Sequence, residues 1–194
     1  MLYLRYLLRK KHSKGHGIHS PFAFDLITNV LYSPYIYYAF TDIPNLLPDT
    51  IIQSKREKRF NRTSFCLINH FKALNILEIN PGDGINTLYI KSPISKINYS
   101  SLPNIGILNS VADRKFDAIF INLNGDENSD NYIETLLNIS HQETFWVINP
   151  IKTKVSKQFC ELIVKHERVT ITFDISDSLI AFLRSSFYKH HYFV

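Results

Sequence analysis

The sequence of 194 residues has only two cysteines, Cys66 and Cys160, and both fall in segments with helical apolar spacing. Two separated cysteines of this kind predict buried packing residues and argue against a disulfide framework or a metal knuckle. No apolar stretch reaches the length of a transmembrane helix, and residues 1–8 are too short and too charged for a secretory signal. We therefore expect a cytoplasmic protein without a membrane span.

Acidic residues are absent from one long internal segment, since no Asp or Glu lies between Asp83 and Asp113. Over the whole chain the basic residues are in excess, and the formal net charge is +5. Much of this excess lies in two clusters, Arg5, Arg9, Lys10, Lys11 and Lys14, and Lys55, Arg56, Lys58, Arg59 and Arg62. Such clusters can contact nucleic acid or anionic lipid, but a solvated helix face is the commoner explanation.

Apolar residues make up 45% of the chain, so the sequence can fill a sizeable core. One apolar run leads into a Gly-x-Gly turn and then into a segment suited to a helix. This region contains Glu78, Asn80, Pro81, Gly82, Asp83 and Gly84. The order predicts a strand, a tight turn and a helix N-terminus, where glycines permit positive φ and backbone N–H groups face a ligand. Taken alone, the pattern is equally typical of an ordinary strand-to-helix connection.

Two further apolar runs, residues 116–122 and 145–149, end in Asn122 and Asn149. Continuous apolar runs that end in polar residues are typical of parallel strands covered on both faces, whose carboxyl ends line a ligand crevice. Residues 169–175 and 179–183 are joined by a short polar link, which predicts an antiparallel hairpin. The expected fold is α/β, with a mostly parallel sheet.

Helical patterns cover residues 1–12, a segment that starts at Ser20-Pro21, and residues 55–71, 130–139 and 154–166. Residues 33–54 are expected to be irregular, residues 95–101 and 105–108 each suit a short strand, and His190-His191 is expected to be an exposed tail. The predicted division is residues 1–54, an N-terminal helical extension with an irregular segment, and residues 55–194, the α/β domain.

Four segments carry a resemblance to class I S-adenosylmethionine-dependent methyltransferases, and in particular to a group of methyltransferases from Bacteroidetes. KGHGIHSPFAF at residues 14–24 is similar to that group's N-terminal signature, and EINPGDGI at residues 78–85 to its cofactor turn. FDAIFIN at residues 116–122 is similar to the strand that normally ends in Asp, and RVTITFD at residues 168–174 to the terminal hairpin. The resemblance implies a seven-stranded Rossmann-like methyltransferase sheet, trimmed in its middle, with the methyl donor across the carboxyl ends of its strands.

The resemblance also implies roles for single residues. Glu78 and the turn formed by Asn80, Pro81, Gly82, Asp83 and Gly84 would face the donor's amino-acid portion, and Asn122 would border the cofactor. From the sequence itself, the glycines at 15 and 17 permit a tight loop, so we expect residues 14–24 to pack over the same edge of the sheet. There His16 and His19 would satisfy backbone carbonyls or, together with Asn149, line the acceptor pocket. The sequence assigns no catalytic residue.

This chain departs from the family pattern where charge is needed. Family members carry an acid after the second strand that grips the donor's ribose, and here only the neutral Ser100, Ser101 or Asn104 stand in that region. We therefore expect weak or absent binding of S-adenosylmethionine.

A metal site is not expected either. Metal-assisted O-methyltransferases use acids where this chain has Asn122 and Asn149, and amides lack the anionic charge that holds Mg²⁺. Asp126, Glu127 and Asp130 match no ligand spacing, and Gly15 and Gly17 interrupt the helix that would align His12, His16 and His19.

Three functions remain open at this point. The first is a methyltransferase with a small-molecule acceptor and an impaired cofactor site. The second is a pseudoenzyme that keeps the fold as a binding or scaffold module for an unknown protein partner. The third, a nucleic-acid methyltransferase, ranks last because no aromatic base-flipping motif is present. A homo-oligomer is compatible with all three.

Overall fold

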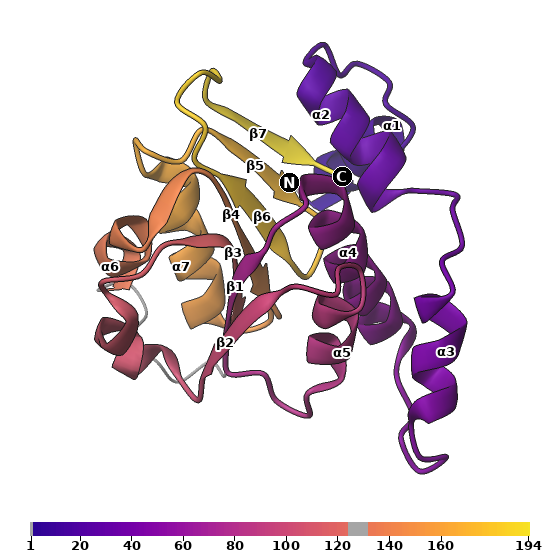
Figure 1. The fold of residues 1–194 in the computed structure, drawn as a ribbon. Helices are drawn as coiled ribbons and strands as arrows, with labels where there is room; N and C mark the ends of the chain where they lie inside the picture. The colour runs from indigo at the N-terminus through magenta and orange to yellow at the C-terminus, as the bar shows by residue number, and fades with distance from the viewer. Residues whose placement is uncertain (1, 124–131) are drawn as a thin grey trace.

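A computed structural model describes residues 2–123 and 132–194, and it contains a seven-stranded sheet of order β2-β1-β3-β4-β6-β5-β7 (Figure 1). The strands are β1 (Asn75–Ile79), β2 (Asn98–Leu102), β3 (Phe116–Asn122), β4 (Ser140–Asn149), β5 (Ile171–Asp174), β6 (Leu179–Phe182) and β7 (His190–Phe193). Strand β6 runs antiparallel to β4 and β5, and the other neighbouring pairs are parallel. The predicted mostly parallel sheet with an antiparallel β5–β6 hairpin is confirmed.

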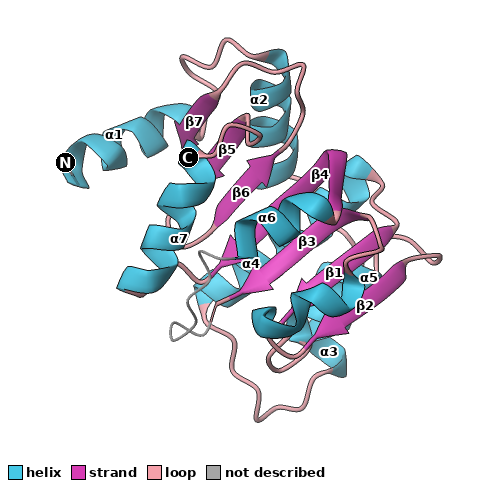
Figure 2. Cartoon of the chain, turned by 90° about the vertical axis from the view of Figure 1, so that its left-hand side faces the viewer, coloured by secondary structure: helices cyan, strands magenta, loops and turns pink. Residues whose placement is uncertain are grey.

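Both faces of the sheet are covered, as Figure 2 shows. On one face lie α4 (Lys55–Phe71), α5 (Ile85–Lys91) and the helical pair α2 (Pro21–Asp25) and η1 (Leu26–Leu31), the latter a π-helix. On the other lie η2 (Ile105–Val111, a 3₁₀ helix), α6 (Ile133–Asn138) and α7 (Lys154–Lys165). Side chains alternate along β1, so Ile76 joins the first apolar cluster and Leu77 the second.

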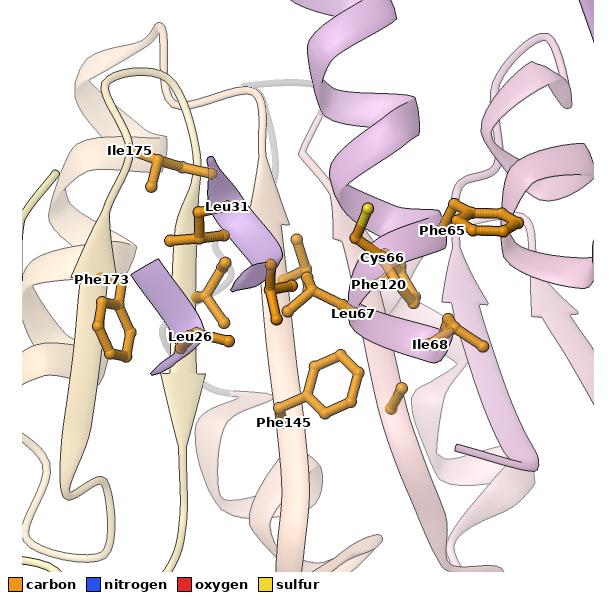
Figure 3. Close-up of a cluster of buried hydrophobic side chains, with 14 of the residues drawn as sticks. Leu26, Leu31, Phe65, Cys66, Leu67, Ile68, Phe120, Phe145, Phe173 and Ile175 are labelled. Carbon is orange, nitrogen blue, oxygen red and sulfur yellow. The ribbon is translucent and has the colours of Figure 1, made fainter. Parts of the chain in front are cut away.

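Helix α4 places the second basic cluster at the carboxyl edge of the sheet. Ser54 and Glu57 form a capping box at its start, with the Ser54 N–H donating to Glu57 Oε2 at 2.7 Å. The helix ends at Lys72, just before β1, so it runs antiparallel to that strand and its first turns lie beside the carboxyl ends of the strands. Figure 3 shows Leu67 and Ile68 of α4 among Phe120 and Phe145 of the sheet.

The N-terminal residues pack on the same sheet. Helix α1 (Leu2–His12) lies against β7, where Arg9 forms a 2.6 Å ion pair with Asp174 and His12 Nδ1 lies 2.9 Å from the carbonyl oxygen of Phe193. Leu26 and Ile27 of η1 are fully buried in the first apolar cluster. None of the helices among the described residues is long and apolar enough to cross a membrane.

Two local predictions are wrong, and a third is wrong in part. A helix, α3 (Ala39–Leu46), forms in the segment predicted to be irregular, because Phe40 and Ile43 bury one side of it. Residues 105–108 form part of η2 instead of a strand. His190 is exposed as predicted, but His190-His191 begins strand β7 and is not a tail: His191 Nδ1 lies 2.7 Å from Thr172 Oγ1, and Tyr192 is buried.

Candidate functional site

The order in which strands are added to the sheet reverses between β1 and β3, which are parallel. From β1 the chain moves to β2 on one side, and it then returns to form β3 on the other side. In open α/β sheets, such a switch point leaves a crevice outside the carboxyl ends of the two strands, where ligands bind. Asn80 directly follows β1 and Asn122 ends β3, so both predicted residues lie at this point.

The glycine turn has the predicted conformation. Gly82 and Gly84 have φ values of 62° and 75°, and Gly84 is the N-cap of α5. Asp83 Oδ1 accepts a 3.0 Å hydrogen bond from the N–H of Ile85, in the first turn of that helix. A Cβ atom built on either glycine would have no heavy atom within 4 Å. The backbone of the turn is therefore open to an approaching ligand, and the glycines are required by φ and not by crowding.

Glu78 lies inside the protein, below this turn. Its side chain is fully buried and accepts hydrogen bonds from Asn86 Nδ2 at 3.0 Å, Thr87 Oγ1 at 2.6 Å and the Tyr99 hydroxyl at 2.8 Å. Burial, with the Glu78 charge adding to it, raises the pKa of Tyr99 to about 12, so this phenol stays protonated and can donate. The carboxylate therefore joins β1 to α5 and β2.

The three donors around Glu78 belong to no recognisable sequence motif. Their only signal is position: Asn86 and Thr87 fall in the first turn of the predicted helix, and Tyr99 falls in the predicted second strand, opposite the first.

Asn80 and Asn122 bind each other across the switch point. Asn80 Nδ2 donates to the carbonyl oxygen of Asn122 at 3.2 Å, and Asn122 Nδ2 donates to the carbonyl oxygen of Asn80 at 2.8 Å. Asn149, at the end of β4, accepts a 2.8 Å hydrogen bond from Ser178 Oγ. The carboxyl ends of these three central strands thus carry amides that are partly used by the protein itself.

The region after β2 offers little to a ribose. Ser100 and Ser101 lie within the strand, paired with Leu77 and Glu78, and only Asn104 lies beyond its end. Asn104 Oδ1 accepts from the N–H of Gly106 at 2.9 Å, which caps η2. The structure therefore supplies no carboxylate from this segment, in agreement with its acid-free sequence.

Neither a scan of protein families nor a search of curated proteins finds a match to this sequence. Solved structures do match it. An O-methyltransferase from Bacillus cereus in complex with S-adenosylhomocysteine is 16% identical, with a TM-score of 0.51 over 76% of this chain and 91% of that one. The O-methyltransferase TomG from Streptomyces achromogenes, in complex with S-adenosylmethionine, is 14% identical, with a TM-score of 0.51 over 78% of this chain and 92% of that one.

A Staphylococcus aureus protein provisionally classed as a caffeoyl-CoA O-methyltransferase is 14% identical, with a TM-score of 0.55 over 95% of this chain and 100% of that one. This chain has the class I methyltransferase fold. At such low identity, the similarity shows the fold alone and assigns no role to any residue.

Within this methyltransferase fold, the predicted position of residues 14–24 is wrong. The Phe22 ring lies 5.0 Å from that of Phe182, which ends β6 at the amino edge of the sheet. Ser20 and Pro21 border a hollow with Ile171, the first residue of β5. The segment follows its aromatic anchors to this edge because apolar surface is available there.

His16 and His19 are exposed, and the helix before them packs on β7, which four strands separate from β1. The structure therefore does not bring them to Asn80, Asn122 or Asn149.

Among residues 2–123 and 132–194, no group of three His, Cys, Asp or Glu side chains could hold a metal ion. Asp126, Glu127 and Asp130 lie outside the described residues. Cys66 and Cys160 are buried free thiols, and burial raises their pKa to about 11 and about 12, so both stay protonated at neutral pH. Neither is a nucleophile in this state.

Proposed function

We propose that this chain is a methyltransferase-like protein that uses S-adenosylmethionine and a small-molecule acceptor, with a weakened donor site. The observation that carries the proposal is the open glycine turn at the β1–β3 switch point of a methyltransferase fold. The solved neighbours in complex with S-adenosylmethionine or S-adenosylhomocysteine support the choice of donor.

The residues present fit one end of the donor better than the other. Gly82 and Gly84 leave backbone exposed for the amino-acid portion, whereas no carboxylate follows β2 to receive the ribose hydroxyls. Losing a charge-assisted hydrogen bond costs about 1.5–3 kcal/mol, or roughly ten- to a hundredfold in affinity. The donor supplies an electrophilic methyl group, and this chain's part is to position the acceptor in line with it.

A second candidate, a binding module without turnover, is favoured by one observation. Asn80 and Asn122 each donate to the other's backbone carbonyl, so a ligand that uses these amide N–H groups has to compete with two existing hydrogen bonds. The nucleic-acid function ranks behind both, and cytoplasmic location and oligomeric state stay predictions.

Calorimetric titration with S-adenosylmethionine and S-adenosylhomocysteine tests the proposal. We expect dissociation constants of about 10–1,000 μM, since the missing charge weakens an otherwise ordinary site. No binding at millimolar ligand would favour the binding module, and sub-micromolar binding would show that another group has replaced the ribose acceptor.

A gain-of-function variant sharpens this test. Asn104→Asp restores a carboxylate after β2 and keeps an acceptor for the cap on Gly106. We expect donor binding to tighten about tenfold. Asn109→Asp adds the same charge to the exposed side of η2 and serves as the control. Equal gains in both variants would indicate general electrostatics instead of a ribose contact.

A further inference from the structure

We propose that the cleft between the basic face of α4 and the preceding segment around Tyr35 binds a small molecule that carries a phosphate group and an aromatic or apolar body. This cleft is called the basic cleft below and is lined chiefly by Lys55, Lys58, Arg59, Arg62, Tyr35 and Phe40. The inference deepens the proposed function by naming the acceptor class, and it rests on that function only for the methyl transfer itself.

The cations of the basic cleft follow from helical spacing. The basic residues recur at intervals of three or four along α4: Lys55 is followed by Lys58 or Arg59, and then by Arg62. They therefore extend along one side of the helix. The capping box fixes the start of the helix and so the direction in which these side chains leave it. The cleft has a volume of about 430 Å³, which lies within the ordinary range for small-molecule sites.

Aromatic rings, and not carboxylates, accompany the two guanidinium groups. Arg59 lies over the Tyr32 ring at 5.2 Å and donates to its hydroxyl at 3.2 Å, and Arg62 lies over the Phe40 ring at 5.1 Å. In the described part of the chain no carboxylate lies within ion-pair distance of Arg59 or Arg62, and none lines the cleft. The positive charge is therefore held in place without being neutralised.

Four cations on one wall repel one another, and an anion relieves this repulsion. Phosphate suits the site because guanidinium groups present paired donors and lysines add point charges. At the rim, Arg56 lies 3.8 Å from Asp177, a distance at which an exposed pair contributes little.

Apart from Ser33 and Thr63, the remainder of the wall is apolar or aromatic. Val30, Leu31 and Cys66 are buried, while Tyr35 and Ile36, at the other side, are 65% and 86% exposed. Exposed apolar side chains beside cations suit the aromatic or aliphatic body of a ligand. A concave site of this size favours a small molecule over a nucleic acid, which needs an extended basic surface.

The basic cleft leads toward the ends of the strands. A second hollow, of about 130 Å³, shares Arg59 and Thr63 with it and reaches Ser176, Asp177 and Ser178, between β5 and β6. Ser178 is bonded to Asn149 at the end of β4. A ligand anchored by its phosphate at Arg62 can thus direct its other end to the edge at which the donor is proposed to bind.

The experiment is a titration of the full chain, without donor, with phenyl phosphate, phenol and inorganic phosphate. We expect phenyl phosphate to bind with a dissociation constant of about 1 mM or lower, and each of the other two at least about tenfold more weakly. Equal affinity for phenol would overturn the anionic part of the proposal, and equal affinity for inorganic phosphate would overturn the aromatic part.

Two matched variants locate the binding. Arg62→Gln removes a guanidinium that lies 5.1 Å from a Phe ring in the cleft, and Arg114→Gln removes one that lies 5.0 Å from the Phe116 ring elsewhere. We expect the first to weaken phenyl phosphate binding at least about tenfold and the second less than about twofold, with melting temperatures recorded for both. Equal losses would overturn the assignment to this cleft.

The last part of the experiment measures binding to macromolecular partners. Single-stranded RNA or phosphatidylglycerol vesicles that bind in an Arg62-dependent way, with no binding of phenyl phosphate, would overturn the small-molecule proposal. Because these titrations contain no S-adenosylmethionine, failure to bind that donor leaves them unaffected, and their failure leaves the donor titration unaffected.

Discussion

The amino edge and the carboxyl edge of the central strands are held together in different ways. At the amino edge, Asp117 of β3 accepts from the N–H groups of Leu74 at 2.8 Å and Asn75 at 2.7 Å, and its other oxygen lies 2.9 Å from His141 Nε2. At the carboxyl edge of the same strands, two neutral amides, Asn80 and Asn122, bind each other.

This difference separates scaffold from candidate site. Hydrogen bonds to charged groups are stronger than neutral ones, so the amino edge is the more firmly closed of the two. The carboxyl edge has open glycines and weaker clamps, and the concentrated charge nearest to it belongs to α4. We infer that a charged group stabilises the sheet at its amino edge. At the carboxyl edge, the cations of α4 are instead available to a ligand of the basic cleft.

The largest expected effect comes from the acid buried between the two edges. Glu78→Ala removes the acceptor for Asn86, Thr87 and Tyr99. The Thr87 and Tyr99 hydroxyls keep each other at 3.3 Å, whereas the buried Asn86 Nδ2 loses its acceptor. We expect a loss of about 3–5 kcal/mol in the free energy of unfolding, measured by chemical denaturation.

Glu78→Gln is the control, since it retains one acceptor oxygen and the volume of the side chain. It should cost about 1–3 kcal/mol. If Glu78→Ala instead leaves stability unchanged and abolishes donor binding, Glu78 belongs to the site and not to the scaffold.

The second prediction concerns the amino edge. Asp117→Ala leaves the N–H groups of Leu74 and Asn75 without their acceptor, and we expect a loss of about 2–4 kcal/mol in the free energy of unfolding. Asp113→Ala, at an exposed acid four residues earlier, should change it by less than about 0.5 kcal/mol. Similar losses in both variants would contradict the view that charge closes this edge.

The third prediction follows from the pKa of Asp117. Burial raises this pKa, but the backbone N–H groups of Asn75 and Leu74 and the His141 side chain together outweigh burial, so the net shift is downward. A lowered folded pKa stabilises the protein above the unfolded value of about 4, and this contribution disappears as the pH falls through the folded pKa.

Denaturation at a series of pH values checks this. The stability of Asp117→Asn should fall less steeply than that of the wild type below about pH 4. If the free energies of unfolding of the two proteins fall equally steeply below about pH 4, other carboxylates dominate acid unfolding.

Most of the fold was predictable from the sequence because its signals are local. Apolar runs mark β1, β3 and the end of β4, and the glycine turn requires positive φ at Gly82 and Gly84. Strand β7 was not predictable, because its sequence, HHYF, shows its role only when paired with β5. Helix α3 likewise forms by burying Phe40 against Phe65 and Tyr37, at 5.2 and 5.4 Å.

The candidate site was predictable in its position and not in its contacts. Asn80, Asn122 and Asn149 end or follow the strands that the sequence indicates. The hydrogen bonds between Asn80 and Asn122 depend on the register of β1 against β3. This register is a long-range property that local sequence patterns do not reveal. The misplacement of His16 and His19 has the same origin, because the aromatic residues that position this segment meet their partners far along the chain.

The fourth prediction tests the neutral hydrogen bonds between Asn80 and Asn122 at the carboxyl edge. Asn122→Ala removes the amide that donates to Asn80, and we expect a loss of about 1 kcal/mol in the free energy of unfolding. If the mutual hydrogen bonds obstruct the donor, the variant should bind S-adenosylmethionine more tightly than the wild type in calorimetry. Weaker binding would instead make the Asn122 side chain a contact of the donor.

The last prediction concerns the glycine turn, where the expected effect on stability is similarly small. Gly84→Ala places a side chain at φ 75°, which costs about 1–2 kcal/mol, but the added Cβ meets no heavy atom within 4 Å. The fold should therefore persist, with a melting temperature lower by several degrees. Gly17→Ala is the control for positive φ, which is 76° there, and α1 and β7 lie far from the turn. Its added Cβ also meets the flexible end of the Lys11 side chain at 3.0 Å, so that side chain has to shift. If the open backbone at Gly84 receives a ligand, only Gly84→Ala should weaken donor binding, because its methyl group occupies the approach that the glycine leaves free. Equal donor affinity in the two variants would make this turn a plain strand-to-helix connection, and the carboxyl edge would then be as purely structural as the amino edge.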